Sequence, residues 1–137
     1  MKKITFILCC LFMAGLSYMN AQESAIHFNA KLVVQEGQMD KFKEVAKLCI
    51  AAVKEHDTGT LQYDWFIDEK SNTCIVRETY KNSQAVLEHM ANVSELLPQL
   101  LEISTPTLEV FGTPSEELQT ALAAFGPSVY PLYKGLE

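Results

Sequence analysis

The sequence contains no cluster of positive charge and almost no arginine. Of its 137 residues, 17 are Asp or Glu and 11 are Lys or Arg, so the formal net charge is −6 at pH 7. Arg77 is the only arginine in the chain. Proteins that bind nucleic acid or an anionic membrane surface concentrate Lys and Arg on one face. The acidic balance without a basic cluster therefore argues against both kinds of partner.

Motifs for the common kinds of catalytic chemistry are also absent from the sequence. His27, His56 and His89 are far apart and lack an Asp or Glu at the spacing of a metal site. No Gly-rich loop precedes a helix, which argues against a phosphate or dinucleotide site. No Ser or Cys lies in a nucleophile elbow. Function must therefore depend on aromatic residues, one helical histidine and a few polar strand residues, and we expect no metal ion and no dinucleotide cofactor.

A long apolar run occurs only at the N-terminus. Lys2 and Lys3 precede the uncharged residues 4–16, and the small residue Ala21 ends the segment. This pattern is typical of a cleavable signal peptide, residues 1–21, because a membrane-spanning helix needs about 20 apolar residues. A membrane anchor is the alternative. We therefore predict a secreted or periplasmic protein with no membrane anchor after cleavage.

Removal of the signal peptide leaves two cysteines, Cys49 and Cys74. Two cysteines in an oxidising compartment can form one disulfide bond. Their positions favour free thiols instead, because Cys49 falls on the apolar face of a predicted helix and Cys74 within a predicted strand. Free cysteine is common in such places as a small core residue.

The hydrophobic pattern predicts one α+β domain over residues 22–112. Alternating apolar and polar residues indicate strands, and apolar residues at three- and four-residue steps indicate helices. The resulting order of strands and helices along the chain is that of the split βαβ, ferredoxin-like fold, in which helices cover one face of the sheet. The other face should carry apolar side chains, which a homodimer would bury by pairing two sheets. The expected elements are strand 25–35, helix 39–56, strands 60–68 and 73–80, a helix starting at Asn82 or Ser83, an apolar stretch 93–101 interrupted by Pro98, and strand 107–111.

The last segment, residues 113–137, is predicted to form a C-terminal helix and a tail that pack on the same domain. Thr113 is the expected cap, Pro114 the first helical residue and Glu116 the second member of a capping box. The helix is expected to stop at Gly126, which a proline follows.

Candidate site residues lie on the predicted strands and on the second helix. Tyr63 and Trp65 share one strand face and are either core residues or the flat wall of a pocket for an aromatic ligand. His89 lies among apolar residues and is either structural or a base that titrates near neutral pH. Arg77 either orients an anionic intermediate or makes a structural ion pair. Asn29 lies on the non-core phase of the first strand, where it faces a polar cavity or solvent.

The central part of the chain resembles the antibiotic biosynthesis monooxygenase family. The resemblance covers about residues 25–111, and the C-terminal segment is similar to an extension of a quinol monooxygenase-like branch of that family. The motifs specify the fold better than the reaction. They are Gly37 before the first helix, Gly59-Thr60-Leu61-Gln62-Tyr63, Glu78-Thr79-Tyr80, and Ser83-Gln84-Ala85 leading to His89.

The resemblance implies a dimeric α/β barrel with a pocket in each subunit. It also implies that O₂ oxidises a small quinol or phenolic aromatic there without metal, flavin or haem. In this hypothesis His89 and Arg77 are catalytic, and Tyr63, Trp65 and Asn29 bind the substrate. The alternative is a non-catalytic dimeric module that binds a small hydrophobic ligand. Haem binding or degradation is a weaker alternative, because the haem-ligating histidine of a related branch falls near a glutamine here.

Overall fold

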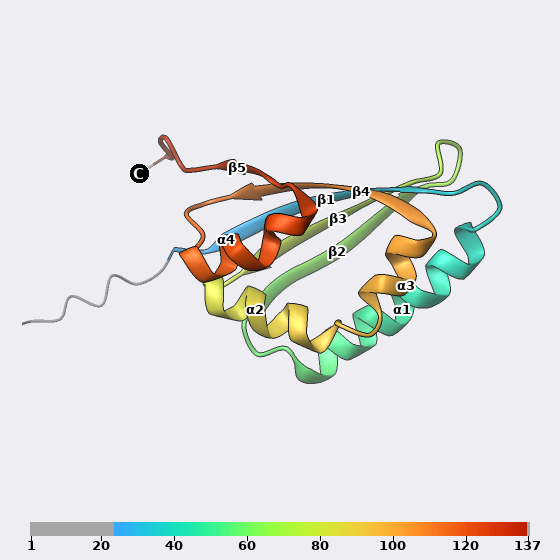
Figure 1. The fold of residues 1–137 in the computed structure, drawn as a ribbon, viewed down its shortest axis with the longest axis horizontal. Helices are drawn as coiled ribbons and strands as arrows, with labels where there is room; N and C mark the ends of the chain where they lie inside the picture. The colour runs from blue at the N-terminus through green and yellow to red at the C-terminus, as the bar shows by residue number, and fades with distance from the viewer. Residues whose placement is uncertain (1–23, 137) are drawn as a thin grey trace, which may run out of the picture.

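Helices cover one face of a five-stranded sheet in the computed structural model, which describes residues 24–136 (Figure 1). The signal peptide predicted for residues 1–21 lies outside this described part. Within it, no helix combines the length and the apolar character needed to cross a membrane. The elements in chain order are β1 (Ile26–Val34), α1 (Met39–His56), β2 (Thr60–Asp68), β3 (Thr73–Tyr80), α2 (Ser83–Asn92), α3 (Leu97–Glu102), β4 (Ser104–Phe111), α4 (Glu116–Leu122), the short 3₁₀ helix η1 (Ala123–Phe125) and β5 (Ser128–Tyr130).

The order of the strands in the sheet is β2-β3-β1-β4-β5. β1 lies between β3 and β4 and pairs antiparallel with both, and β2 pairs antiparallel with β3. The two strand-helix-strand halves therefore interleave in one sheet, as the split βαβ pattern requires. The ferredoxin-like α+β fold predicted from the sequence is confirmed.

Alternation along the strands decides which side chains meet the helices. Ile26, Phe28, Leu32 and Val34 of β1 are buried against the helices. Two buried clusters result, one beneath α1 and α3 and the other beneath α2 and α4. Cys49 and Cys74 are members of the first cluster. Both are buried free thiols, as their positions in the sequence predicted.

The segment between α2 and β4 differs from the prediction. Pro98 does not interrupt a helix but lies in the first turn of α3, where a missing backbone N–H leaves no helical hydrogen bond unmade. β4 begins at Ser104 rather than at residue 107. The Ser104 hydroxyl donates to the Leu100 carbonyl at 2.7 Å, which joins the end of α3 to the start of the strand.

The C-terminal segment also departs from the prediction at two points. The cap of α4 is Ser115 rather than Thr113: the Ser115 side chain accepts a hydrogen bond from the Leu118 backbone N–H at 3.2 Å. The tail contains β5, which pairs parallel with β4 and was not predicted. A strand of three residues is too short to show a period in sequence.

The uncovered face of the sheet is more polar than expected. Register places His27, Asn29, Arg77 and Thr79 on it, beside a few exposed apolar residues. The apolar exceptions include Val33, Phe66, Phe111 and Tyr130, and the rings of the last two stack with their centroids 5.4 Å apart.

Helix α2 lies directly against the residue before β2. A Cβ atom on Gly59 would lie 2.4 Å from the Ala85 Cβ, so α2 can approach this closely only because residue 59 is glycine. We expect Gly59→Ala to lower the free energy of unfolding by about 1–3 kcal/mol through overpacking. Urea denaturation measures the loss. Gly135→Ala is the matched control, because a Cβ there meets nothing within 4 Å. An unchanged midpoint for Gly59→Ala would contradict the tight contact.

Candidate functional site

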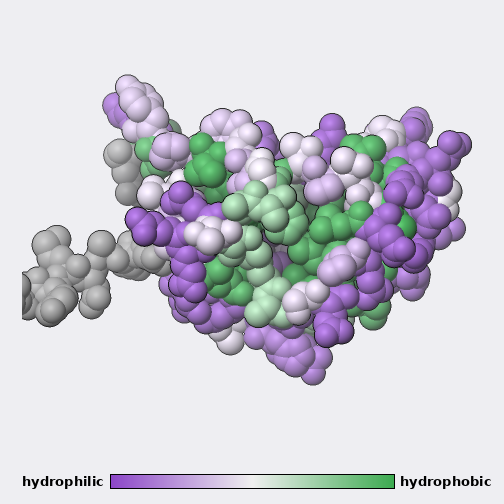
Figure 2. Space-filling model, viewed as in Figure 1, coloured by the Kyte–Doolittle hydropathy of each residue, from purple (hydrophilic) through white to green (hydrophobic). Residues whose placement is uncertain are grey.

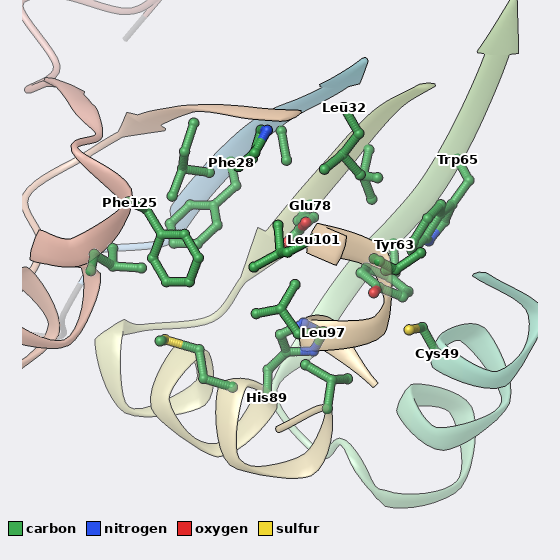
Figure 3. A pocket seen from close by; sticks show the side chains of 18 of the residues that line it. Phe28, Leu32, Cys49, Tyr63, Trp65, Glu78, His89, Leu97, Leu101 and Phe125 are labelled. Carbon is green, nitrogen blue, oxygen red and sulfur yellow. The ribbon is translucent and has the colours of Figure 1, made fainter. Parts of the chain in front are cut away.

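A cavity of about 100 Å³ lies between the sheet and the helices (Figure 3). β1 to β4 form its floor, and residues of α1, α2, α3, α4 and η1 form its walls and cover. Apolar side chains surround a recess near the centre of the face shown in Figure 2. Most lining residues are apolar, and the polar or titratable exceptions are Cys49, Tyr63, Glu78, His89 and Thr107.

Strand register places several cavity residues in rows across the sheet. Tyr63 of β2 is opposite Glu78 of β3, which is opposite Phe28 of β1. The next row contains Trp65 and, on β1, Ala30. Because the methyl group of Ala30 is the smallest side chain on the covered face of β1, it leaves space beneath the helices.

A β-bulge in β2 directs Tyr63 and Trp65 towards the helices. The pairing register shifts between Thr60 and Gln62, and Leu61 is consequently 65% exposed. The rings of Tyr63 and Trp65 meet edge to face with centroids 5.5 Å apart. The Trp65 indole N–H is buried and has no hydrogen-bond partner among the described residues, so it is available to a ligand. Both residues therefore line one cavity, and their role in substrate binding stays a prediction.

Asp57 holds His89 in one orientation. The distance between His89 Nδ1 and Asp57 Oδ2 is 2.7 Å, and the two side chains are 8% and 4% exposed. Asp57 also accepts hydrogen bonds from the Thr60 hydroxyl at 2.6 Å and the Asn92 amide at 2.7 Å. Burial acts to raise the pKa of Asp57, but these hydrogen bonds outweigh it and hold the pKa below its ordinary value. The carboxylate is therefore ionised at neutral pH and accepts the Nδ1 proton.

The other ring nitrogen of His89, Nε2, has no hydrogen-bond partner among residues 24–136. The imidazole packs between two tyrosine rings, with centroid distances of 5.1 Å to Tyr63 and 5.2 Å to Tyr80. An imidazole oriented by a carboxylate through Nδ1, with Nε2 free, is the arrangement of a general base. The sequence pointed to His89 but gave no signal for Asp57, which lies 32 residues away.

Glu78 is a second titratable residue of the cavity, and the sequence did not identify it as a site residue. The Tyr80 hydroxyl donates to its Oε2 atom, whereas Oε1 has no partner within the described part of the chain. Burial raises the pKa of Glu78, and a positive charge on His89 would act in the opposite direction. In Figure 3 the side chains of Tyr63, Glu78 and His89 point into the same space. Glu78 could have been found from the period of β3, which places it opposite Tyr63.

Tyr63 contributes a hydroxyl that remains protonated. Burial, together with the negative charge of Glu78, raises the pKa of Tyr63 far above its ordinary value. The phenol can therefore donate a hydrogen bond to a ligand oxygen but cannot act as a base. In residues 24–136, no group of three His, Cys, Asp or Glu side chains is placed to hold a metal ion. The polar groups that line the cavity can transfer protons and form hydrogen bonds within apolar walls.

The structure does not bring Arg77 and Asn29 to this cavity. Neighbouring residues of a strand point to opposite faces, so Arg77 lies on the uncovered face and Glu78 on the covered one. The Asn29 amide donates to Glu109 at 2.8 Å on the uncovered face. The roles predicted for Arg77 and Asn29 therefore cannot be performed in the helix-covered cavity. Both line a polar hollow of about 480 Å³ together with His27, Gln62, Thr79 and Phe111, and this hollow shares Phe28 and Glu78 with the helix-covered cavity.

The model of the antibiotic biosynthesis monooxygenase family matches residues 25–94. The chain belongs to this family, as the resemblance of its motifs indicated. The matched region runs from β1 through α2 and contains Tyr63, Trp65, Glu78 and His89.

Several solved structures share the fold. MupZ from Pseudomonas fluorescens is 21% identical, with a TM-score of 0.74 over 84% of this chain and 95% of MupZ. SnoaB, a cofactor-independent oxygenase from Streptomyces nogalater, is 16% identical, with a TM-score of 0.57 over 67% of this chain and 95% of SnoaB. A conserved protein of unknown function from Bacteroides thetaiotaomicron is 25% identical, with a TM-score of 0.59 over 65% of this chain and 97% of that protein. No curated protein sequence matches the chain.

The charge state of Asp57 predicts a pH-dependent contribution to stability. Its folded-state pKa lies below the ordinary value of about 3.9, so the ionised form stabilises the fold above that pH. The stabilisation is lost as the pH falls through the folded-state pKa. We expect Asp57→Asn to lower the free energy of unfolding by about 1–3 kcal/mol at pH 7, and by less below about pH 3.

Urea denaturation at both pH values measures this difference. Asp64→Asn, which changes an exposed carboxylate on β2, is the control and should have little effect at either pH. Equal losses for Asp57→Asn at the two pH values would contradict the assigned charge state.

Proposed function

We propose that the protein is a cofactor-independent monooxygenase that oxidises a small quinol or phenolic aromatic compound with O₂. One observation carries the proposal: Asp57 orients His89 so that a free ring nitrogen borders an apolar cavity lined by Tyr63 and Trp65. Family membership supports the reaction class. So does the fold shared with SnoaB, which is described as a cofactor-independent oxygenase.

The reaction begins with removal of a proton. Deprotonation of a quinol or phenol makes its ring electron-rich enough to donate an electron to O₂. His89 Nε2 takes the hydroxyl proton, and Asp57 stabilises the imidazolium that forms. The apolar walls exclude water from the reacting anion, while Tyr63 and Trp65 position the aromatic ring.

The oxidation of a quinol balances without a further reagent. One electron passes from the quinol anion to O₂, and the resulting superoxide and semiquinone combine to form a C–O bond at a ring carbon. The O–O bond then breaks. One oxygen atom stays on the ring, and the other leaves as water with two protons. The product is a hydroxyquinone, so the substrate loses four electrons and O₂ gains four.

The cavity must widen to admit such a substrate. Its volume of about 100 Å³ is smaller than the roughly 300–1,000 Å³ of typical ligand pockets. Leu97 and Leu101 of α3 and Phe125 of η1 line it from the side opposite the sheet. Outward movement of these side chains opens the cavity without disturbing the polar groups on β2, β3 and α2.

A non-catalytic module that binds a small hydrophobic ligand is the second candidate. The predominance of apolar residues in the cavity wall favours it. Ligand binding without oxygen consumption would establish this function, and a Soret band on addition of haem would point to a haem-binding protein instead.

We also propose that the mature protein is an exported homodimer. The predicted signal peptide supports export, and the exposed Phe66, Phe111 and Val33 on the uncovered sheet face support pairing of two sheets.

Replacement of His89 tests the catalytic proposal. We expect His89→Ala to lower turnover of menadiol by about 100- to 10,000-fold, the usual effect of removing a general base. Oxygen-electrode kinetics measure turnover, and thermal melts show whether the variant folds. His89→Gln is a second variant: its amide can still donate to Asp57 but cannot take a proton, so it should fold and remain slow. His56→Ala, at an exposed histidine on α1, is the control. A folded His89→Gln variant with parental turnover would refute the assignment of His89 as the general base.

Replacement of Phe66 tests the dimer. We expect the parent to sediment as a dimer at micromolar concentration and Phe66→Glu to sediment as a monomer, because the charge would be buried between the two sheets. Leu48→Glu is the matched control, because Leu48 lies on α1 and is 54% exposed, as is Phe66. A monomeric parent, or a dimeric Phe66→Glu variant, would count against this interface.

A further inference from the structure

Glu78 places a carboxyl group in an apolar cavity, and the proton transfer assigned to His89 does not use it. Among the described residues that line the cavity there is no Lys or Arg to pair with it. A buried carboxylate without a cationic partner is unfavourable unless its hydrogen bonds compensate for the lost hydration. The presence of this group therefore needs a physical explanation.

The hydrogen bond from Tyr80 does not by itself explain a carboxyl group at this position. The Tyr80 hydroxyl occupies Oε2 only. An amide oxygen would accept the same hydrogen bond without the unfavourable burial of a charge. Oε1 remains without a partner in the described part of the chain, although the side chain lies on the covered face of the sheet beside Tyr63. The open oxygen is therefore available to a ligand in the cavity.

Glu78 and His89 border the same part of the cavity from opposite sides. Glu78 projects from β3 and His89 from α2, and both line the cavity (Figure 3). Each has one polar atom bonded to a protein partner and one with no partner among residues 24–136: Oε1 of Glu78 and Nε2 of His89. The cavity thus presents two proton acceptors to one ligand, with the Tyr63 hydroxyl beside them.

We propose that Glu78 is a second catalytic residue and that it selects aromatic substrates with two hydroxyl groups and no negatively charged substituent. The inference rests on the proposed function. Oxidation of a quinol to a hydroxyquinone removes two hydroxyl protons, and two protons leave in the water formed. His89 Nε2 takes the first proton and Glu78 Oε1 takes the second, after which both protons pass to the departing oxygen.

Glu78 can take a proton only in its ionised form, and the negative charge of that form also sets the selectivity. Two negative charges close together in an apolar cavity repel each other strongly. The only arginine, Arg77, lies on the opposite face of the sheet and cannot offset the repulsion. An aromatic compound with a carboxylate or phosphate group is therefore rejected, whereas a neutral quinol is accepted.

Replacement of Glu78 with glutamine separates catalysis from structure. Glu78→Gln keeps the size of the side chain and an oxygen for the Tyr80 hydroxyl. We expect turnover of menadiol to fall by about 100-fold or more. The melting temperature at pH 7 should stay equal or rise, because burial raises the pKa of Glu78 and its ionised form is unfavourable in the folded state above the ordinary pKa. Glu109→Gln, on the uncovered face, is the control. A lower melting temperature with unchanged turnover would overturn the catalytic role.

A binding measurement that needs no turnover tests the selectivity. Trp65 is the only tryptophan in the chain and lines the cavity, so quenching of its fluorescence reports occupancy. We expect the parent to bind 1,4-naphthoquinone at least about tenfold more tightly than its 2-carboxylate, and Glu78→Gln to lose most of this preference.

The two measurements distinguish failure of this inference from failure of the proposed function. If the parent consumes no oxygen with any quinol, but Glu78→Gln loses the preference for the neutral quinone, the proposed function fails and the selectivity stands. If the parent oxidises quinols, and Glu78→Gln matches it in rate and in preference, the function stands and the inference about Glu78 fails.

Discussion

The carboxylate of Asp57 is the point on which the site depends. It follows the last residue of α1 and accepts hydrogen bonds from Thr60 at the start of β2 and from His89 and Asn92 on α2. The Asn92 amide also donates to the Ala52 carbonyl in α1 at 3.0 Å. One ionised group therefore fixes two helices and a strand relative to one another. The same bonds that lower its pKa also set the direction of the His89 ring.

The backbone around Asp57 makes this arrangement possible. The absence of a side chain at Gly59 allows α2 to lie against the start of β2, and the bulge at Leu61 then turns Tyr63 towards the helices. His89 is consequently clamped between two tyrosine rings on neighbouring strands. A small side chain at Ala30 leaves the space that the polar atoms border. The site therefore results from two features: the tyrosine rings pack closely against His89, and the small side chain of Ala30 leaves the space that becomes the cavity.

Much of the fold was predictable because its signals are local. Alternation in β1, the apolar period of α1 and the start of α2 each lie within one segment. The first two were predicted correctly, and of the two predicted starts of α2, Asn82 and Ser83, the structure shows Asn82 as the cap. The site was predictable only in part. His89 and Trp65 carry residue types that indicate a function, whereas Asp57 acquires its role from a partner 32 residues away. The sequence could not show that Arg77 and Asn29 lie away from the helix-covered cavity. It shows that strand residues alternate between two faces, but not which face encloses a cavity.

The groups that can move protons and the groups that shape the cavity come from different parts of the chain. Tyr63, Glu78 and His89 all lie within residues 25–94, the region that matches the family. The cover lies beyond it, in Leu97 and Leu101 of α3 and in the C-terminal segment. Because the polar groups are attached to the sheet and α2, the cover can vary in length and side-chain size without displacing them. The positions of the titratable groups are thus set by β2, β3 and α2, and the cover of the cavity is formed by the segments that follow.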